Sequence, residues 1–211
     1  VEEKFGDVLP KMKWLNMGGG HHITRPGYEI KKLEKCIGYA KKQWQVEVYL
    51  EPGEAVALNA GYLVTKVLDV VTNGDVKIAI LDSSAACHMP DVIEMPYTPP
   101  LYDAIRAEDM EALEITEPEN HRNQQNTRKY CYRLAGPTCL AGDVIGDYCF
   151  AEERKEGDLL VFGDMAIYTT CKNNTFNGMP LPDIWRRTGT GKLLRLTKFG
   201  YEEFKKRLGS R

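Results

Sequence analysis

The stretch WLNMGGGHHITRPGYEIKKLEKCIGYAKKQWQVEVYLEPG, residues 14–53, decides the fold class of the N-terminal part of the chain. An apolar run at 14–17 predicts a buried strand, and three glycines follow it directly. Apolar residues then recur at helical spacing with lysines on the opposite face, and VEVYL predicts a second strand. Strand, glycine loop, helix and strand in this order are typical of a parallel α/β layer.

The pattern changes from Ala55 onward. Short apolar runs alternate with turn signals such as Asn73-Gly74-Asp75, and only the tail at 199–208 has a helical pattern. Such spacing favours a β-barrel or a β-sandwich. We therefore predict two domains, an α/β segment at 1–52 and an all-β domain at 53–211, with a polar loop at 117–128.

Composition excludes several classes of function. The net charge is −2, and acidic and basic residues are interspersed, which argues against nucleic acid or an anionic membrane as the main partner. No apolar run reaches transmembrane length, so we expect neither a membrane span nor a signal peptide in these residues. Six cysteines without a CxxC pair predict neither a zinc site nor a disulfide framework, and free thiols favour a cytoplasmic location.

The glycine loop is the first candidate for binding chemistry. Gly18, Gly19 and Gly20 leave consecutive amides unobstructed, which suits phosphate oxygens, although a tight structural turn explains three glycines equally well. The adjacent His21 and His22 point in different directions, so a two-histidine metal site is not predicted. We expect one of these histidines to pack and the other to line a pocket.

Three further residues have both a functional and a structural interpretation. Glu51 ends a predicted strand, where ligand pockets of α/β sheets open, or it caps the following turn. Cys139 lies in the Gly/Pro-rich bend of LAGPTCLAGD, where a thiol serves as an acid or nucleophile, or is a small buried hydrophobe. Tyr168, at the end of a predicted strand, offers its hydroxyl to a phosphate or packs in the core.

Taken in order, five motifs resemble the C-terminal part of one enzyme family: MGGGHH, EPGE, LDSSAACHMPDVIEMPY, GPTCLAGD and AIYTTCKNNTFNG. The family is the pyridoxal-phosphate decarboxylases of the alanine racemase fold group, and the resemblance is to its carboxynorspermidine/carboxyspermidine branch. It covers essentially the whole chain. It implies the end of a (β/α)8 barrel followed by a C-terminal β-barrel, and a homodimeric enzyme of polyamine biosynthesis that yields norspermidine or spermidine.

The resemblance also implies a role for each motif. The triple glycine and Tyr168 would hold the phosphate of pyridoxal 5'-phosphate, and Glu51 would keep the pyridine nitrogen protonated. Cys139 would reach the other subunit's site and protonate the carbon that has lost carbon dioxide. His22 would border the cofactor or substrate. The amines of the substrate would be met by further acids, namely Asp91, Glu94 and Asp143.

The departures from the family pattern also have consequences. Glu54 stands where relatives often have an arginine near the phosphate, and Leu140 stands where ornithine and diaminopimelate enzymes have an acid. The second change favours a longer polyamine over those two substrates, which remain the enzymatic alternative. No lysine here matches the cofactor lysine, so we expect a fragment, or a companion chain that supplies it. A non-catalytic binding homologue is the other alternative.

Overall fold

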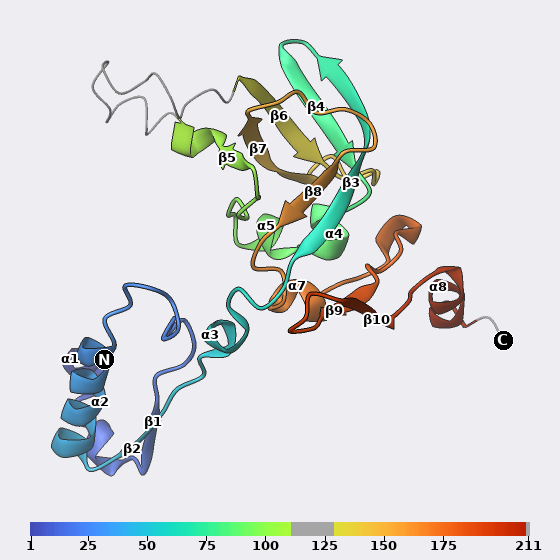
Figure 1. Ribbon diagram of the computed structural model, residues 1–211. Coiled ribbons are helices and arrows are strands. Elements are labelled where there is room, and N and C mark those ends of the chain that lie inside the picture. Colours follow the sequence, from blue (N-terminus) through green and yellow to red (C-terminus); the bar gives the residue numbers. More distant parts are fainter. Residues whose placement is uncertain (111–128, 210–211) are drawn as a thin grey trace, which may run out of the picture. The chain divides into compact units, whose positions relative to one another are not determined.

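The computed structural model describes residues 1–110 and 129–209, so the predicted loop at 117–128 lies outside the described residues. The chain divides into two compact units, a first unit at Val1–Leu58 and a second unit at Asn59–Arg211. Figure 1 labels the elements of both units.

The first unit has the predicted order of strand, loop, helix and strand. After α1 (Glu2–Phe5) and the 3-10 turn η1 (Leu9–Lys11), strand β1 (Trp14–Asn16) pairs in parallel with β2 (Glu47–Tyr49). Helix α2 (Ile30–Trp44) connects the two strands, and α3 (Gly53–Ala57) ends the unit. The parallel α/β prediction is confirmed for this segment.

The predicted burial of the first strand is wrong. Trp14 is 59% exposed and lies edge-on against Tyr49 with the ring centroids 6.1 Å apart. Alternate side chains of a strand face opposite sides, and in this two-stranded sheet only the side of Leu15 packs against the core. That core consists of Leu9, Ala40, Trp44 and Val46.

The second unit is built on a six-stranded sheet with the order β5-β7-β6-β4-β3-β8. Its strands are β3 (Leu63–Asn73), β4 (Val76–Leu81), β5 (Ala104–Arg106), β6 (Tyr130–Ala135), β7 (Val144–Phe150) and β8 (Leu159–Phe162). β4 and β6 are parallel, and the other pairs are antiparallel. The predicted turn at Asn73-Gly74-Asp75 joins β3 to β4, and Gly74 has a φ of 60°.

Hydrogen bonds link the two edges of this sheet. Just before β5, the Tyr102 amide donates to the Val161 carbonyl at 3.0 Å, and the Gly163 amide donates to the Pro100 carbonyl at 2.8 Å. The chain that leads into one edge strand therefore pairs with β8, the other edge strand. Paired edges leave fewer backbone groups open to another chain.

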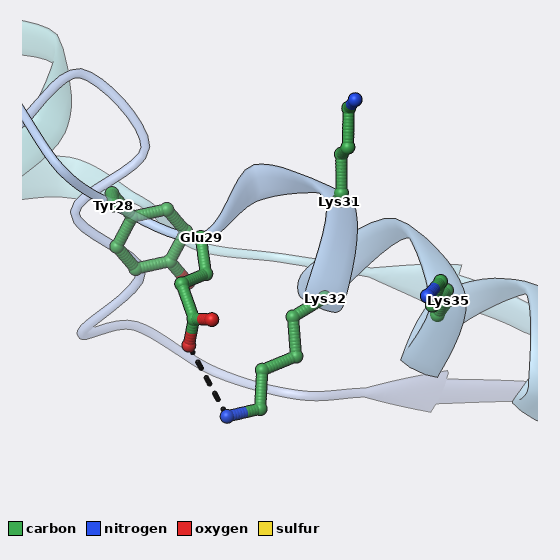
Figure 2. Close-up of a pocket in the computed structure, with 5 residues that line it drawn as sticks. All are labelled: Tyr28, Glu29, Lys31, Lys32 and Lys35. Atoms are coloured by element: carbon green, nitrogen blue, oxygen red, sulfur yellow. Dashed lines mark hydrogen bonds and ion pairs between the residues drawn. The ribbon is translucent and has the colours of Figure 1, made fainter.

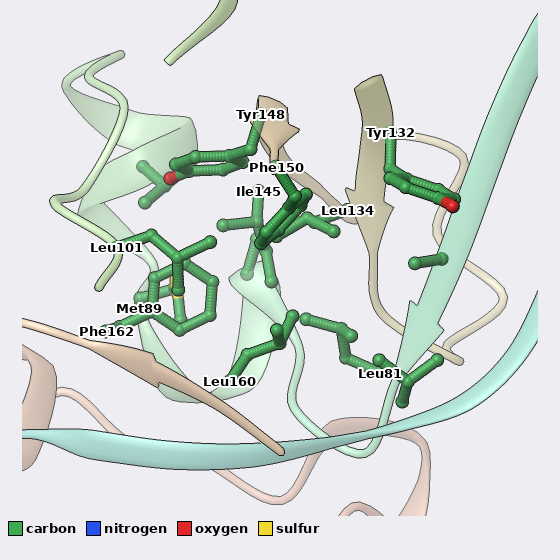
Figure 3. Close-up of a cluster of buried hydrophobic side chains, with 14 of the residues drawn as sticks. Leu81, Met89, Leu101, Tyr132, Leu134, Ile145, Tyr148, Phe150, Leu160 and Phe162 are labelled. Carbon is green, nitrogen blue, oxygen red and sulfur yellow. The ribbon is translucent and has the colours of Figure 1, made fainter. Parts of the chain in front are cut away.

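Aromatic and aliphatic side chains from both sides of the curled sheet fill its interior (Figure 3). Tyr148 packs edge-on against Phe162 with centroids 6.1 Å apart, and Tyr132 does the same with Phe150 at 6.0 Å. The buried Tyr148 hydroxyl donates to the Pro99 carbonyl at 2.7 Å, and burial raises the pKa of this tyrosine far above its usual range. The core therefore satisfies the polar tip of Tyr148 while burying its ring.

Short helical elements follow the strands. α4 (Ala85–His88) and α5 (Asp91–Glu94) come after β4, and α7 (Tyr168–Cys171) and the 3-10 turn η3 (Phe176–Gly178) come after β8. β9 (Ile184–Arg187) and β10 (Leu193–Thr197) form a separate antiparallel hairpin, and α8 (Tyr201–Arg207) is the helix predicted at the tail. No helix in the described ranges is long and apolar enough to cross a membrane.

Two predictions about this unit are wrong. Tyr168 does not end a strand, because β8 stops at Phe162 and the chain turns at Asp164, whose φ is 54°. The expectation of free thiols fails for Cys131 and Cys149, which form a disulfide. They are separated by 18 residues, and only the β6–β7 register places them opposite each other.

Candidate functional site

The glycine turn and the end of β2 lie side by side. Gly18 and Gly20 have φ values of 73° and 76°, which side chains other than glycine rarely adopt. The Glu51 amide donates to the Gly18 carbonyl at 2.8 Å. A Cβ on Gly19 would lie 3.1 Å from the Glu51 carbonyl oxygen, so the middle glycine permits this close approach.

Asn16 connects these two parts, and the sequence analysis missed it. Its side-chain amide donates to the Glu51 carboxylate at 2.5 Å, and its side-chain oxygen accepts from the Gly18 amide at 2.8 Å. An asparagine two residues before a glycine is a common Asx-turn signal, which points to the bond with Gly18 but not to the one with Glu51. Glu51 caps no helix, since α3 begins without a side-chain cap. Its exposed carboxylate is therefore held beside the glycine turn.

The two histidines have different surroundings. The ring nitrogens of His21 lie 3.4 Å from the Tyr28 hydroxyl and 3.3 Å from the Met17 carbonyl. His22 instead lies with Nδ1 3.1 Å from the Glu54 carboxylate, which is also 3.9 Å from the Arg25 guanidinium. Both histidines are half-buried: His21 contacts residues of its own loop, and His22 faces Glu54.

A shallow hollow of about 560 Å³ lies at the start of α2, lined by Tyr28, Glu29 and three lysines (Figure 2). Within it, Lys32 and Glu29 form an ion pair at 3.2 Å. Figure 2 shows Lys31 pointing away from that pair. These lysines belong to the polar face that the helical pattern predicts, and we assign no ligand to them.

Cys139 is an exposed free thiol in the turn between β6 and β7, so its interpretation as a buried hydrophobe is wrong. Asp143, in contrast, is only 3% exposed. Its carboxylate accepts from the Ser84 hydroxyl, the Ala85 amide and the Thr138 hydroxyl. Because the chain's own donors occupy both oxygens, the expected substrate role of Asp143 is corrected to a structural one.

Tyr168 is 50% exposed, which removes its core interpretation. The Lys172 ammonium lies 5.1 Å from the centre of its ring. The same ammonium bonds to the Asp91 carboxylate and lies 3.3 Å from that of Glu94. The bond with Asp91 is the main cause that raises the pKa of Lys172. Both predicted amine-binding acids therefore bind an ammonium, one that belongs to the chain itself.

Among the described residues, no group of three or more His, Cys, Asp or Glu side chains could hold a metal ion. The first unit presents the unobstructed backbone amides of the glycine turn beside the fixed carboxylate of Glu51. The second unit offers an exposed thiol, an exposed phenol and a pair of acids.

The chain belongs to the pyridoxal-dependent decarboxylases, because the model of their C-terminal sheet domain matches residues 39–166. It is 42% identical to a carboxynorspermidine/carboxyspermidine decarboxylase of Campylobacter jejuni, over 96% of this chain and 51% of the relative. A carboxyaminopropylagmatine decarboxylase of Synechocystis is 38% identical, over 99% of this chain and 50% of the relative.

A solved structure agrees with these relatives. The crystal structure of carboxynorspermidine decarboxylase from Campylobacter jejuni, complexed with norspermidine, superposes with a TM-score of 0.76 at 42% identity. The match covers 98% of this chain and 54% of that one. The chain thus spans about half the length of the relatives that it matches.

Proposed function

We propose that this chain is the C-terminal portion of an enzyme that removes carbon dioxide from carboxynorspermidine or carboxyspermidine, giving norspermidine or spermidine. The observation that carries the proposal is the Glu51 carboxylate held by Asn16 beside the glycine turn. The 42% identical decarboxylase named above supports the choice of substrate. In this proposal the first unit ends a (β/α)8 barrel and the second unit is a β-barrel.

The residues of the first unit fit pyridoxal 5'-phosphate. No atom lies within 4 Å of a Cβ placed on Gly18 or Gly20, so a phosphate group has room to approach the amides of the turn. When bound, the cofactor supplies an electron sink for the electron pair released with carbon dioxide. A carboxylate beside the ring nitrogen, as proposed for Glu51, raises the pKa of that nitrogen and keeps it protonated.

Two side chains of the second unit have a role in the proposal. Tyr168 would hold the cofactor phosphate through its hydroxyl, and Cys139 would deliver a proton to the carbon that has lost carbon dioxide. We propose that Cys139 acts in the site of the other subunit, which requires a homodimer with two shared sites. A segment or companion chain beyond these 211 residues supplies the cofactor lysine.

Asp91 and Glu94 are proposed to receive an ammonium group of the substrate, because they already bind the Lys172 ammonium. Two separate carboxylates around a compact charge suit an ammonium better than a planar guanidinium. That geometry favours a carboxylated polyamine over the agmatine derivative in the name of the Synechocystis relative. His22 is proposed to border the cofactor or the substrate.

The test uses the enzyme that contains this chain and a panel of five substrates: carboxynorspermidine, carboxyspermidine, carboxyaminopropylagmatine, diaminopimelate and ornithine. We expect one of the first two to release carbon dioxide with the highest kcat/KM. A charge-assisted hydrogen bond contributes about 1.5–3 kcal/mol, so Glu51→Gln should lower kcat roughly 10- to 150-fold. Glu47→Gln, in the strand β2 that precedes Glu51, is the matched control.

Three results would contradict the proposal. Full turnover by the Glu51→Gln variant would remove this carboxylate from the mechanism. A preference for diaminopimelate or ornithine would select the enzymatic alternative. Cofactor-free protein without carbon dioxide release from any member of the panel would favour a non-catalytic homologue.

A further inference from the structure

A buried carboxylate holds the turn that contains the exposed Cys139 thiol. One oxygen of Asp143 accepts from the Ala85 amide at 2.7 Å and from the Ala86 amide at 3.3 Å. The other oxygen accepts from the Thr138 hydroxyl at 2.7 Å. The Ser84 hydroxyl lies 2.9 Å from both oxygens. Asp143 therefore ties the first residues of α4 to the turn between β6 and β7.

The turn itself closes around Cys139. The Thr138 hydroxyl that donates to Asp143 also accepts from the Leu140 amide at 3.4 Å. The Asp143 amide in turn donates to the Leu140 carbonyl at 3.0 Å. The residues on both sides of Cys139 are thus fixed by one hydroxyl and one carboxylate, while the thiol remains exposed.

α4 is a firm anchor for this arrangement. At its far end, His88 lies with Nε2 3.0 Å from the Pro180 carbonyl, and the Asn174 side chain donates to the Ala86 carbonyl at 2.8 Å. Ser84 caps the start of the helix by accepting from the Cys87 amide at 3.2 Å. The residues from Ser84 to His88 are buried or partly buried, so a packed segment holds the carboxylate.

We infer that Asp143 and Thr138 are positioning residues that hold the Cys139 thiol in one orientation. The buried carboxylate fixes the Thr138 hydroxyl, and this hydroxyl fixes the amide on the far side of the thiol. Neither residue touches the reacting atoms. The role of that orientation rests on the proposed function: the thiol delivers a proton to a single face of the substrate carbon.

Two hydroxyl deletions separate positioning from general stability. Thr138→Val and Ser84→Ala each remove one hydroxyl that bonds to Asp143, but only the Thr138 hydroxyl also bonds to the Leu140 amide. Thr138→Ser keeps the hydroxyl and is the rescue variant. The enzyme that contains this chain is treated with iodoacetamide, and the labelling rate of each thiol is followed by peptide mass. The exposed thiols of Cys36 and Cys171 are internal references.

The expected result is specific to one variant. Thr138→Val should change the labelling rate of Cys139 at least threefold relative to the two reference thiols, and Thr138→Ser should restore it. Ser84→Ala should leave that ratio within 1.5-fold of the parent, whatever it does to the melting temperature. An unchanged ratio in Thr138→Val, or an equal change in Ser84→Ala, would overturn the inference.

A second measurement links the orientation to the reaction. Decarboxylation of carboxynorspermidine in D2O should place deuterium in a single configuration with the parent enzyme and with Ser84→Ala. Thr138→Val should give a mixed configuration, and a single configuration there would also count against the inference. If the parent releases no carbon dioxide, the proposed function fails, while the labelling rates still decide whether Thr138 orients the thiol.

Discussion

Replacing Asp143 with alanine decides whether this acid serves the fold or the substrate. The carboxylate is buried and accepts hydrogen bonds from two hydroxyls and from backbone amides of α4. Removing it leaves these donors without their acceptor inside the protein. We therefore expect a large loss of stability, together with a loosened turn around Cys139.

The loss of stability in Asp143→Ala depends on the buried donors that cannot reorient toward another acceptor. The Ala85 amide is fully buried and fixed, and an unsatisfied buried donor costs about 1–3 kcal/mol. The two hydroxyls can rotate, but the start of α4 loses its acceptor, which costs about 1 kcal/mol more by analogy with a helix cap. The total is about 3 kcal/mol, which corresponds to a fall in melting temperature of roughly 6–12 °C for a unit of this size.

The assay is thermal unfolding followed by circular dichroism, alongside steady-state kinetics with carboxynorspermidine. Asp75→Asn, in the exposed turn between β3 and β4, is the matched control and should stay within about 0.5 kcal/mol of the parent. The reasoning is refuted if Asp143→Ala melts with the parent and raises only KM. That pattern would return Asp143 to the substrate site.

Four further outcomes are expected. Cys139→Ala should still release carbon dioxide but form polyamine product slowly or misdirect it, whereas Cys171→Ala should behave as the parent; normal product at the normal rate would exclude the thiol. Gly18→Ala should cost about 1–2 kcal/mol through its positive φ and weaken cofactor binding measured by absorbance, whereas Gly38→Ala inside α2 should be neutral or stabilising. Lys172→Met should lower KM for the polyamine substrate, because the Lys172 ammonium then no longer competes for Asp91 and Glu94. The decrease should be at most about fivefold, since an ion pair of this exposure contributes no more than about 1 kcal/mol, and an increase in KM would contradict the competition. Burial lowers the pKa of His88, so below the ordinary histidine pKa of about 6.5 the unfolded chain binds a proton that the folded chain does not. Stability should therefore fall as the pH drops through that value. His88→Gln should flatten this pH dependence of the melting temperature between pH 7.5 and 5.

The local elements follow from short-range patterns in the sequence. The spacing of apolar residues from Ile30 predicts α2, which runs to Trp44 and ends as Gln45 turns to a φ of 58°. The Asn73-Gly74-Asp75 signal predicts the β3–β4 hairpin, and the tail pattern predicts α8. These predictions succeed because helix periodicity and turn chemistry depend on neighbours along the chain.

The sequence placed Glu51 and the triple glycine each at the end of a predicted strand, and only the family resemblance assigned them to one cofactor. It could not identify Asn16 as their link, since that role depends on a hydrogen bond between residues 35 positions apart. Nor could it separate His21 from His22, because adjacent side chains differ only in the surroundings that folding provides.

Tertiary structure alone determined the hydrogen-bond partners of Asp143 and the disulfide between Cys131 and Cys149. Asp143 meets Ser84 across 59 positions, and Cys131 meets Cys149 only through the register of β6 and β7. A carboxylate or a thiol has the same composition whether it faces a substrate or the chain's own donors. The sequence determined which chemical groups this protein has and in what order, whereas long-range packing determined which of them remain free to react.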